Sequence, residues 1–181
     1  GRGAMTNHWV DLQHAKTILV EGRNVGENHP MAFKWIRKAQ ENGARLIHVD
    51  PRFTRTSAGA DIYARIRPRA DVAFLNAMVN HILVNKLYDE DFVMTHTNAL
   101  FLGDAEFDFQ NGLFGGFDAE KRKYDTKTWG YQLDGTGRPR VRESLDDPNC
   151  IFTRLRKFFS RYTLEVGESM SGVPAAQIKL V

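Results

Sequence analysis

Polar and basic residues that suit an anionic ligand gather in three short segments of the sequence. These segments span residues 22–29, 50–57 and 65–71, the last of which includes a loop at 67–71, and each follows a short apolar stretch. Backbone N–H groups at the start of a helix bind phosphate, and arginine side chains add charged donors. If the three segments meet in the fold, they predict a binding site for a phosphate-rich ligand such as a dinucleotide.

The first segment joins an apolar run to a helix that is expected to begin at Pro30. It contains Gly22 and Gly26 but lacks the pattern Gly-x-Gly-x-x-Gly, so a standard nicotinamide site is poorly supported. The first N–H groups of the helix face this loop, and Arg23 and Asn24 add donors for a phosphate. An ordinary turn that needs glycine for its dihedral angles explains the same loop equally well.

Asp50 opens the second segment, directly after an apolar run. In Rossmann-type folds the carboxylate at this place accepts a hydrogen bond from a ribose or a base. A carboxylate also accepts both N–H groups of a guanine edge, which distinguishes guanine from adenine. Arg52 and Arg55 follow at once. The alternative, and the commoner case when such a residue stands alone, is that Asp50 only caps the turn before Pro51.

Arginines alternate in the third segment, at Arg65, Arg67 and Arg69. Alternate residues of a strand project to the same side, so these three predict a small positive patch. A solvated strand face explains the alternation as well. The ligand-binding interpretation is favoured because three polar segments are expected to meet at one edge of the sheet. Such an edge suits a dinucleotide better than a small neutral molecule.

The stretches around these segments alternate between strand and helix. Apolar residues recur every three or four positions in the helical stretches, and Asp71 is placed to N-cap the second of them. Two successive strand–helix–strand connections imply a parallel sheet, with the polar segments at the carboxyl ends of its strands. The expected fold class is therefore α/β, a Rossmann-like parallel sheet with flanking helices. The expected strands are 17–20, 44–49 and 62–66, and the expected helices are 30–42 and 72–85.

The chain changes character near residue 101. Residues 101–149 are rich in glycine, aromatic and charged residues, which predicts an irregular, extended insertion with short strands and a hairpin at 131–137. The expected organisation is a dinucleotide-binding-like α/β unit at 1–100, then the insertion, then closing helices of the same domain at 150–181. Both ends of the chain read as truncated.

Further helices are expected outside the sheet region. One covers 89–95, with Phe92 and Val93 facing inward, and another covers 151–162. Two short closing helices follow, because Thr163 and Ser171 are residue types that start helices. The side chains expected to be buried in the helix at 151–162 are Leu155, Phe158 and Phe159.

Composition narrows the function classes. The formal net charge of +3 is too slight to argue for nucleic acid. No apolar run approaches the ~20 residues that cross a bilayer, so no direct membrane span is expected. Cys150 is the single cysteine, and the six histidines lack metal-ligand spacing. We therefore expect no metal ligand and no catalytic group, and retain only His29, which lies on the first segment.

Nine short sequence strings, spread over nearly the whole chain, together resemble the sequence of a known enzyme family. They are residues 1–9, 22–30, 42–47, 50–56, 88–93, 111–114, 117–125, 160–163 and 171–174. In this order they resemble the catalytic subunit of formate dehydrogenases in the molybdopterin oxidoreductase superfamily. The strings at 1–9 and 111–125 are similar to the respiratory type of that enzyme.

The resemblance implies oxidation of formate to carbon dioxide at a molybdenum or tungsten centre held by bis-molybdopterin guanine dinucleotide (bis-MGD). It also implies an iron–sulfur cluster elsewhere in the full-length protein. The implied partners are the rest of the catalytic subunit and an electron-transfer iron–sulfur subunit. The family's selenocysteine or cysteine metal ligand precedes the string at residue 1, so this chain alone is expected to be inactive. The compartment is unknown from the chain, although the resemblance implies a periplasmic or membrane-associated complex.

The same resemblance implies which residues hold the cofactor. In the family, the segments that match 22–29, 50–54 and 69–71 contact one guanine dinucleotide, and residues that match Thr6 and Asn7 lie near a pterin. Arg69-Ala70-Asp71 departs from the usual Gly-Thr-Asp at its first two positions. The expected cofactor-binding residues are Thr6, Asn7, Gly22, Arg23, Asn24, Glu27, Asn28, His29, Asp50, Pro51, Arg52, Thr54, Arg69 and Asp71.

Two other classes of function remain open at this point. The chain is alternatively a non-catalytic nucleotide-binding module, in which the loops bind a guanine dinucleotide and no chemistry follows. A third reading is an interaction domain whose basic edge docks an acidic partner.

Overall fold

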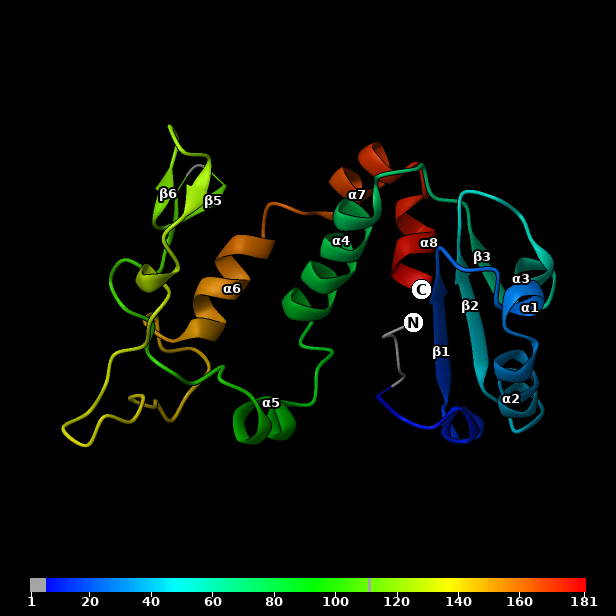
Figure 1. The fold of residues 1–181 in the computed structure, drawn as a ribbon, viewed down its shortest axis with the longest axis horizontal. Helices are drawn as coiled ribbons and strands as arrows, with labels where there is room; N and C mark the ends of the chain where they lie inside the picture. Colours follow the sequence, from blue (N-terminus) through cyan, green and yellow to red (C-terminus); the bar gives the residue numbers. More distant parts are fainter. Residues whose placement is uncertain (1–5, 111) are drawn as a thin grey trace. The chain divides into compact units, whose positions relative to one another are not determined.

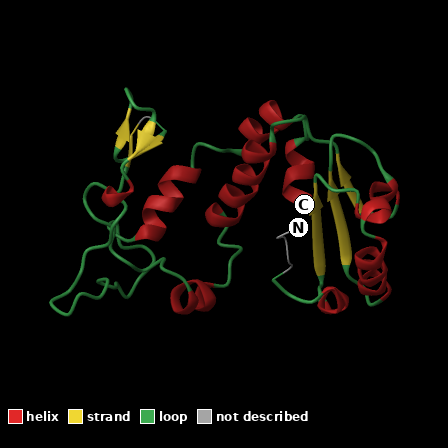
Figure 2. Ribbon diagram, in the orientation of Figure 1, coloured by secondary structure: helices red, strands yellow, loops and turns green. Residues whose placement is uncertain are grey.

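A parallel sheet of three strands forms the centre of the N-terminal part of the chain (Figures 1 and 2). The computed structural model describes residues 6–110 and 112–181. The strand order is β1-β2-β3, and every neighbouring pair is parallel. The predicted α/β fold class with a parallel sheet is therefore confirmed. The strands are β1 (Thr17–Glu21), β2 (Arg45–Val49) and β3 (Ile62–Ala64).

Two of the strings that carried the resemblance extend beyond the described part of the chain. Residues 1–5 of the first string and Asn111 of the string at 111–114 lie outside the described residues. The rest of both strings is included, so Thr6 and Asn7 can be placed.

One face of the sheet is covered by α2 (Pro30–Glu41). Side chains alternate along a strand, so Ile18 of β1 and Leu46 of β2 point to the same side, where Ile36 and Ala39 of α2 pack against them. The predicted helix at 30–42 is thus confirmed, and its buried positions follow helical spacing.

The other face of the sheet is covered by α4 (Asp71–Val84) and α8 (Ala175–Leu180). Ile47 of β2 points to this side and packs in one cluster with Phe74 and Ile178. Because helices lie on both faces, every residue of β2 after Arg45 is buried.

The helix α7 (Leu164–Ser171) joins this second layer. Gly167 lets it approach α4 closely, since a Cβ at this position would lie 2.6 Å from the Ala77 Cβ. The closing helices therefore complete the core of the sheet. The short elements of the same part of the chain are η1 (Trp9–His14), α1 (Val25–Asn28) and α3 (Arg55–Ala58).

The chain divides into two compact units. Unit 1 comprises residues up to Met78 together with Leu164–Val181, and unit 2 comprises Val79–Thr163. Unit 2 begins within α4 because the last turns of this helix, with Val79 and Leu83, pack in a cluster with other residues of unit 2. This division differs from the sequence-based boundaries at residues 100 and 149, and it assigns the last helices of the chain to unit 1.

Unit 2 contains short, irregular elements. Two small antiparallel pairs, β4–β5 and β6–β7, lie within residues 109–124. A further antiparallel bridge between Leu133 and Pro139 closes a hairpin that overlaps the one predicted at 131–137 and is shifted toward the C-terminus. The elements are α5 (Glu90–His96), β4 (Phe109–Gln110), β5 (Leu113–Phe114), β6 (Phe117–Asp118), β7 (Lys123–Tyr124), η2 (Thr126–Thr128) and α6 (Ile151–Phe159).

Some finer predictions about unit 2 are wrong. Phe92 is 57% exposed, because α5 turns the following residues, Val93 and Met94, toward the core cluster. Leu155 is 37% exposed, because Phe152 carries the buried face of α6. Phe158 and Phe159 are partly buried, as expected.

Two predicted helix caps are also wrong. Asp71 is the first residue of α4, and the Phe74 N–H bonds to the Ala70 carbonyl, so Ala70 takes the cap position. Ser171 ends α7, and Pro174 precedes α8. The Ser171 hydroxyl instead accepts the Val173 N–H in the connection between the two helices.

Candidate functional site

The loop after β1 turns at Gly22 and leads through the single turn of α1 into α2. Gly22 has φ +61°, in the left-handed region that favours glycine, and its N–H donates to the Val49 carbonyl at 2.8 Å. No side chain caps the start of α2, whose first residue is Pro30. The loop is therefore held against β2 at its beginning and leads to an uncapped helix start.

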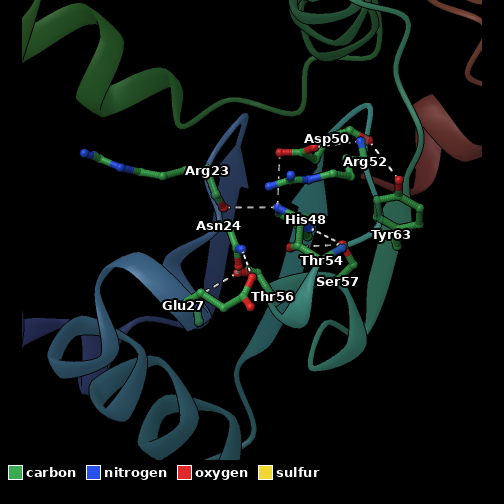
Figure 3. Close-up of polar contacts among 11 residues, drawn as sticks. Arg23, Asn24, Glu27, His48, Asp50, Arg52, Thr54, Thr56, Ser57 and Tyr63 are labelled. Atoms are coloured by element: carbon green, nitrogen blue, oxygen red, sulfur yellow. Dashed lines mark hydrogen bonds and ion pairs between the residues drawn. The ribbon is translucent and has the colours of Figure 1, made fainter.

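His48 lies under this loop and is 0% exposed. Its Nε2 is 3.2 Å from the Arg23 carbonyl oxygen, and its Nδ1 is 2.8 Å from the Ser57 hydroxyl (Figure 3). A carbonyl can only accept, so Nε2 carries the proton and the Ser57 hydroxyl donates to Nδ1. Burial lowers the pKa of His48, against the opposing effect of the Asp50 charge and the Arg23 carbonyl, and favours the neutral ring. His48 thus positions the loop.

A second set of hydrogen bonds ties the same loop to the segment after β2. The Thr56 hydroxyl donates to Asn24 Oδ1 at 3.1 Å and accepts the Gly26 N–H at 2.9 Å (Figure 3). The Asn24 amide donates to the Glu27 carboxylate, which also lies 3.4 Å from Arg55 Nε. Asn24 is buried, so its polar atoms serve to shape the loop.

Asp50 lies just beyond β2, at the edge where the sequence predicts a ligand-binding carboxylate. Its Oδ1 accepts the Arg52 backbone N–H at 2.7 Å, and its carbonyl accepts the Tyr63 hydroxyl at 2.9 Å. Its Oδ2 is 3.9 Å from His48 Nε2. The turn cap that the sequence left as an alternative is therefore present, and it engages only one carboxylate oxygen.

The remaining residues of the second segment have separate surroundings. The Thr54 N–H donates to Ser57 Oγ at 2.8 Å at the start of α3, and Thr54 is buried. Pro51 lines a hollow of about 440 Å³ together with Arg65 and Arg67. Thr54 therefore shapes the segment, while Pro51 faces a surface of its own.

Two arginines at this edge have side chains that are free to meet an anion. Arg23 and Arg52 are exposed, and neither forms an ion pair within residues 6–110 and 112–181. Figure 3 shows Arg23 extending away from the loop and Arg52 lying beside Asp50. These two guanidinium groups are charge-assisted donors for an anion at the strand ends.

The predicted strand patch of three arginines is wrong. β3 ends at Ala64, so the arginines that follow lie in a loop and do not alternate along a strand. Arg67 Nη1 donates to the Ser169 carbonyl at 2.8 Å and is engaged with the closing helices. Arg69 has φ +70°, a left-handed conformation that is costly for a residue with a Cβ.

Glu21, the last residue of β1, lies beside these residues and is absent from the cofactor-binding residues expected from the sequence. Its Oε1 is buried and has no hydrogen-bond partner in the described part of the chain, and the same holds for His29 Nδ1. Burial, and then the negative charge of Asp71, raise the pKa of Glu21. Glu21 and His29 line a cleft of about 540 Å³ beside the edge strand β1, with Arg23 among its other lining residues.

Thr6 and Asn7 lie in different surroundings from the strand-end residues. They line a hollow of about 560 Å³ with Trp9, Met31 and Trp35. This hollow borders the N-terminal half of α2. Asn28 and Glu27, by contrast, belong to α1 within the loop after β1.

The sequence contained a signal for the missed residues. Glu21 is a charged residue that ends an apolar run, and His48 interrupts the apolar run of β2. Ser57 and Thr56 follow Asp50 closely. The partners of Thr56, which are Asn24 and Gly26, come from the other loop, about thirty residues away, and spacing alone does not reveal such pairs.

Two kinds of feature are absent from the described residues. No group of three or more His, Cys, Asp or Glu side chains there is arranged to hold a metal ion. Among the same residues, no helix combines the length and the apolar character that a membrane crossing requires.

Comparison with known proteins identifies the family. The family model described as molybdopterin oxidoreductase matches residues 1–166, which is most of the chain. The chain belongs to the molybdopterin oxidoreductase family. The resemblance that the sequence strings indicated is thereby confirmed.

Relatives within this molybdopterin oxidoreductase family are formate dehydrogenase subunits. The chain is 48% identical to formate dehydrogenase subunit alpha of Megalodesulfovibrio gigas over 96% of its length. It is 46% identical to the major subunit of the nitrate-inducible formate dehydrogenase of Escherichia coli over 97% of its length. In each case the match covers 17% of the relative, so the chain spans about a sixth of these proteins.

A solved structure supports the fold independently of sequence. Acetylene hydratase from Pelobacter acetylenicus matches 91% of this chain with a TM-score of 0.58, over 16% of its own length. The sequence identity is 20%, so the likeness concerns the fold alone. The α/β arrangement of this molybdopterin oxidoreductase segment is thus found in a known structure.

Proposed function

We propose that the chain is part of a formate dehydrogenase catalytic subunit that oxidises formate to carbon dioxide. In this proposal its own task is to hold one guanine dinucleotide of a bis-MGD cofactor that carries molybdenum or tungsten. The observation that carries the proposal is the 48% identity to a formate dehydrogenase alpha subunit over 96% of the chain. An iron–sulfur cluster elsewhere in the subunit and an electron-transfer partner subunit belong to the same proposal.

The residues at the strand ends fit such a cofactor chemically. The dinucleotide is anionic, and Arg23 and Arg52 offer guanidinium groups without an ion-pair partner in the described residues. Asp50 keeps Oδ2 outside its turn bond, where it can accept from a ribose or base. The buried His29 Nδ1 without a partner also requires a polar group from outside these residues.

The scaffold beneath these groups favours binding by preorganisation. His48 and Thr56 join the loop after β1 to the segment after β2, and both are fully buried. Ligand groups held by rigid loops lose less entropy on binding. In this proposal Arg23 and Arg52 bind the phosphates, whereas His48 and Thr56 fix the loops that carry them. The bound cofactor supplies the redox chemistry.

The proposal is tested on the full-length protein that contains this chain. We expect purified protein to release guanosine monophosphate on acid hydrolysis, to contain molybdenum or tungsten, and to reduce a dye when formate is added. Guanine nucleotide without formate oxidation would instead support the non-catalytic nucleotide-binding module. Absence of both guanine nucleotide and metal from active protein would contradict the proposal.

The 181-residue chain on its own serves as a control for where the chemistry resides. We expect it to give no formate-dependent dye reduction, because this chain is proposed to supply cofactor binding and not the reacting centre. Dye reduction by the isolated chain would overturn this assignment of tasks.

A further inference from the structure

The buried carboxylate oxygen of Glu21 lacks a hydrogen-bond donor. Glu21 Oε1 has no partner in the described residues, although it is shielded from water. An unsatisfied buried acceptor destabilises a protein, more so when it is charged, unless a ligand or another group donates to it. The position is therefore one at which an outside N–H donor would relieve an existing cost.

The place of Glu21 in the fold brings it to the cofactor edge. It ends β1 opposite Val49 of β2, one residue before Asp50, so its side chain stands among the strand ends. It also lines the cleft beside β1 that Arg23 and His29 line. The cleft is large enough, at about 540 Å³, to admit a bicyclic heterocycle.

A second carboxylate lies close enough to act on the first. The charge of Asp71, in the first turn of α4, contributes after burial to the raised pKa of Glu21. The ionised carboxylate of Glu21 offers acceptors and no donors, so it favours a ligand edge that presents several N–H groups. Such an edge is the 2-amino-4-oxopyrimidine unit, with a ring N–H beside an exocyclic amino group.

Asp50 is less suited to this edge than the sequence indicated. Its Oδ1 already accepts the Arg52 N–H at 2.7 Å, which leaves one carboxylate oxygen without that bond. A pair of parallel N–H groups needs two acceptor oxygens in one plane. Glu21 retains the free carboxylate that this geometry requires, since the hydrogen bonds of the described residues include none to its side chain.

We propose that Glu21 is a specificity-determining residue whose carboxylate accepts the ring N–H and the amino group of a 2-amino-4-oxopyrimidine edge of the bound cofactor. This inference rests on the proposed function, because it places the cofactor at the same strand ends. Guanine and pterin both carry this edge, so the experiment must distinguish them.

The test uses the full-length protein, prepared as apoprotein in a host that makes no molybdopterin. Calorimetry compares guanosine monophosphate with inosine monophosphate, which lacks the amino group, and pterin with lumazine, which carries a second carbonyl in its place. We expect wild type to prefer the amino-bearing member of one pair by roughly ten- to hundredfold, the range for a bidentate contact. The pair that shows the preference identifies which end of the cofactor Glu21 contacts.

Glu21→Gln then isolates the residue. An amide can accept from only one of the two N–H groups, so we expect the preference to fall to nearly none while inosine monophosphate or lumazine binds as before. Glu41→Gln, at the exposed end of α2, is the matched control and should keep the preference. Far-ultraviolet circular dichroism of both variants confirms that they are folded.

The outcomes separate the inference from the function on which it rests. Binding with an unchanged preference in Glu21→Gln would overturn the role of Glu21 and leave the proposed function intact. Wild type that binds neither guanosine monophosphate nor pterin would overturn both.

Discussion

Unit 1 and unit 2 are each stabilised internally, and the interactions within unit 1 differ from those within unit 2. Unit 1 buries mainly aliphatic side chains between a sheet and the helices on its two faces. In unit 2, an aromatic cluster around Phe114 and Phe158 packs against short hairpins. Arg154 donates there to the carbonyls of Gly103, Asp104 and Phe107. Irregular backbone needs such side-chain donors, because its polar groups have no ladder to join.

This contrast explains where prediction from sequence succeeds. The spacing of apolar residues in unit 1 indicates its strands and helices directly. The parallel sheet follows from the alternation of strands with helices along the chain. In unit 2 the deciding contacts join residues about fifty positions apart, such as Arg154 and Asp104. No local pattern encodes such pairs. The sequence therefore predicts an irregular insertion but not its internal structure.

The candidate site shows the same limit at smaller scale. Asp50 and Arg23 could be placed at the sheet edge, because residues that follow parallel strands share that edge. The engagement of Asn24 by Thr56 could not, because it depends on how two loops meet. The role of Glu21 was missed because a charged residue at a strand end is usually solvated, and only its burial shows otherwise.

The largest expected effect tests the core of unit 1. Phe74→Ala removes a fully buried ring from the cluster between the sheet and α4, and should destabilise unit 1 by about 3–5 kcal/mol. Hydrogen exchange resolved to peptides would measure this in the full-length protein. Val72→Ala on the exposed side of the same helix should stay within about 0.5 kcal/mol. Equal losses in both variants would contradict the account in which the buried core between the sheet and α4 stabilises unit 1.

The next effect tests the side-chain donors of unit 2. Arg154→Met keeps much of the side-chain length but removes the guanidinium hydrogen bonds to three carbonyls, and should cost about 2–3 kcal/mol. The loss of exchange protection should be confined to peptides of unit 2. Arg156→Met, which breaks only an exposed ion pair with Asp146, should cost less than about 1 kcal/mol. Similar losses would show that the carbonyl contacts are unimportant.

A smaller effect is expected where two loops of unit 1 are joined by a buried side chain. His48→Leu removes the acceptor for the Ser57 O–H and the donor to the Arg23 carbonyl, at a cost of about 1–3 kcal/mol. Exchange should accelerate in residues 22–29 and 50–58. His14→Leu, at an exposed position, is the matched control. Unchanged exchange in both loops would mean that His48 does not hold them together.

The smallest expected effects concern how the stability of the protein depends on pH. Two carboxylates of unit 1 should change this dependence in opposite directions. The pKa of Glu21 is raised by burial and then by Asp71, so folding becomes less favourable as pH rises through its titration. Glu21→Gln should therefore stabilise the protein at neutral pH and change little below about pH 4. The thermal midpoint, followed from acid to neutral pH, measures the difference.

Asp61 should behave in the opposite way. The Leu46 N–H, followed by the Gln40 amide, lowers the pKa of Asp61, so its contribution is present above the ordinary carboxyl range and is lost as pH falls. Asp61→Asn should lower the thermal midpoint at neutral pH, and the difference should shrink toward acid. The same sign of pH dependence in both variants would contradict the assignments.

The central claim is that the strand-end edge of unit 1 binds the guanine dinucleotide. It is tested most directly by the dissociation constant for guanosine diphosphate, measured by calorimetry on full-length apoprotein. Combined Arg23→Ala and Arg52→Ala should weaken binding at least about tenfold, because two charge-assisted phosphate contacts are lost. Combined Arg138→Ala and Arg140→Ala in unit 2 should leave it unchanged. Equal dissociation constants for the two double variants would contradict the claim.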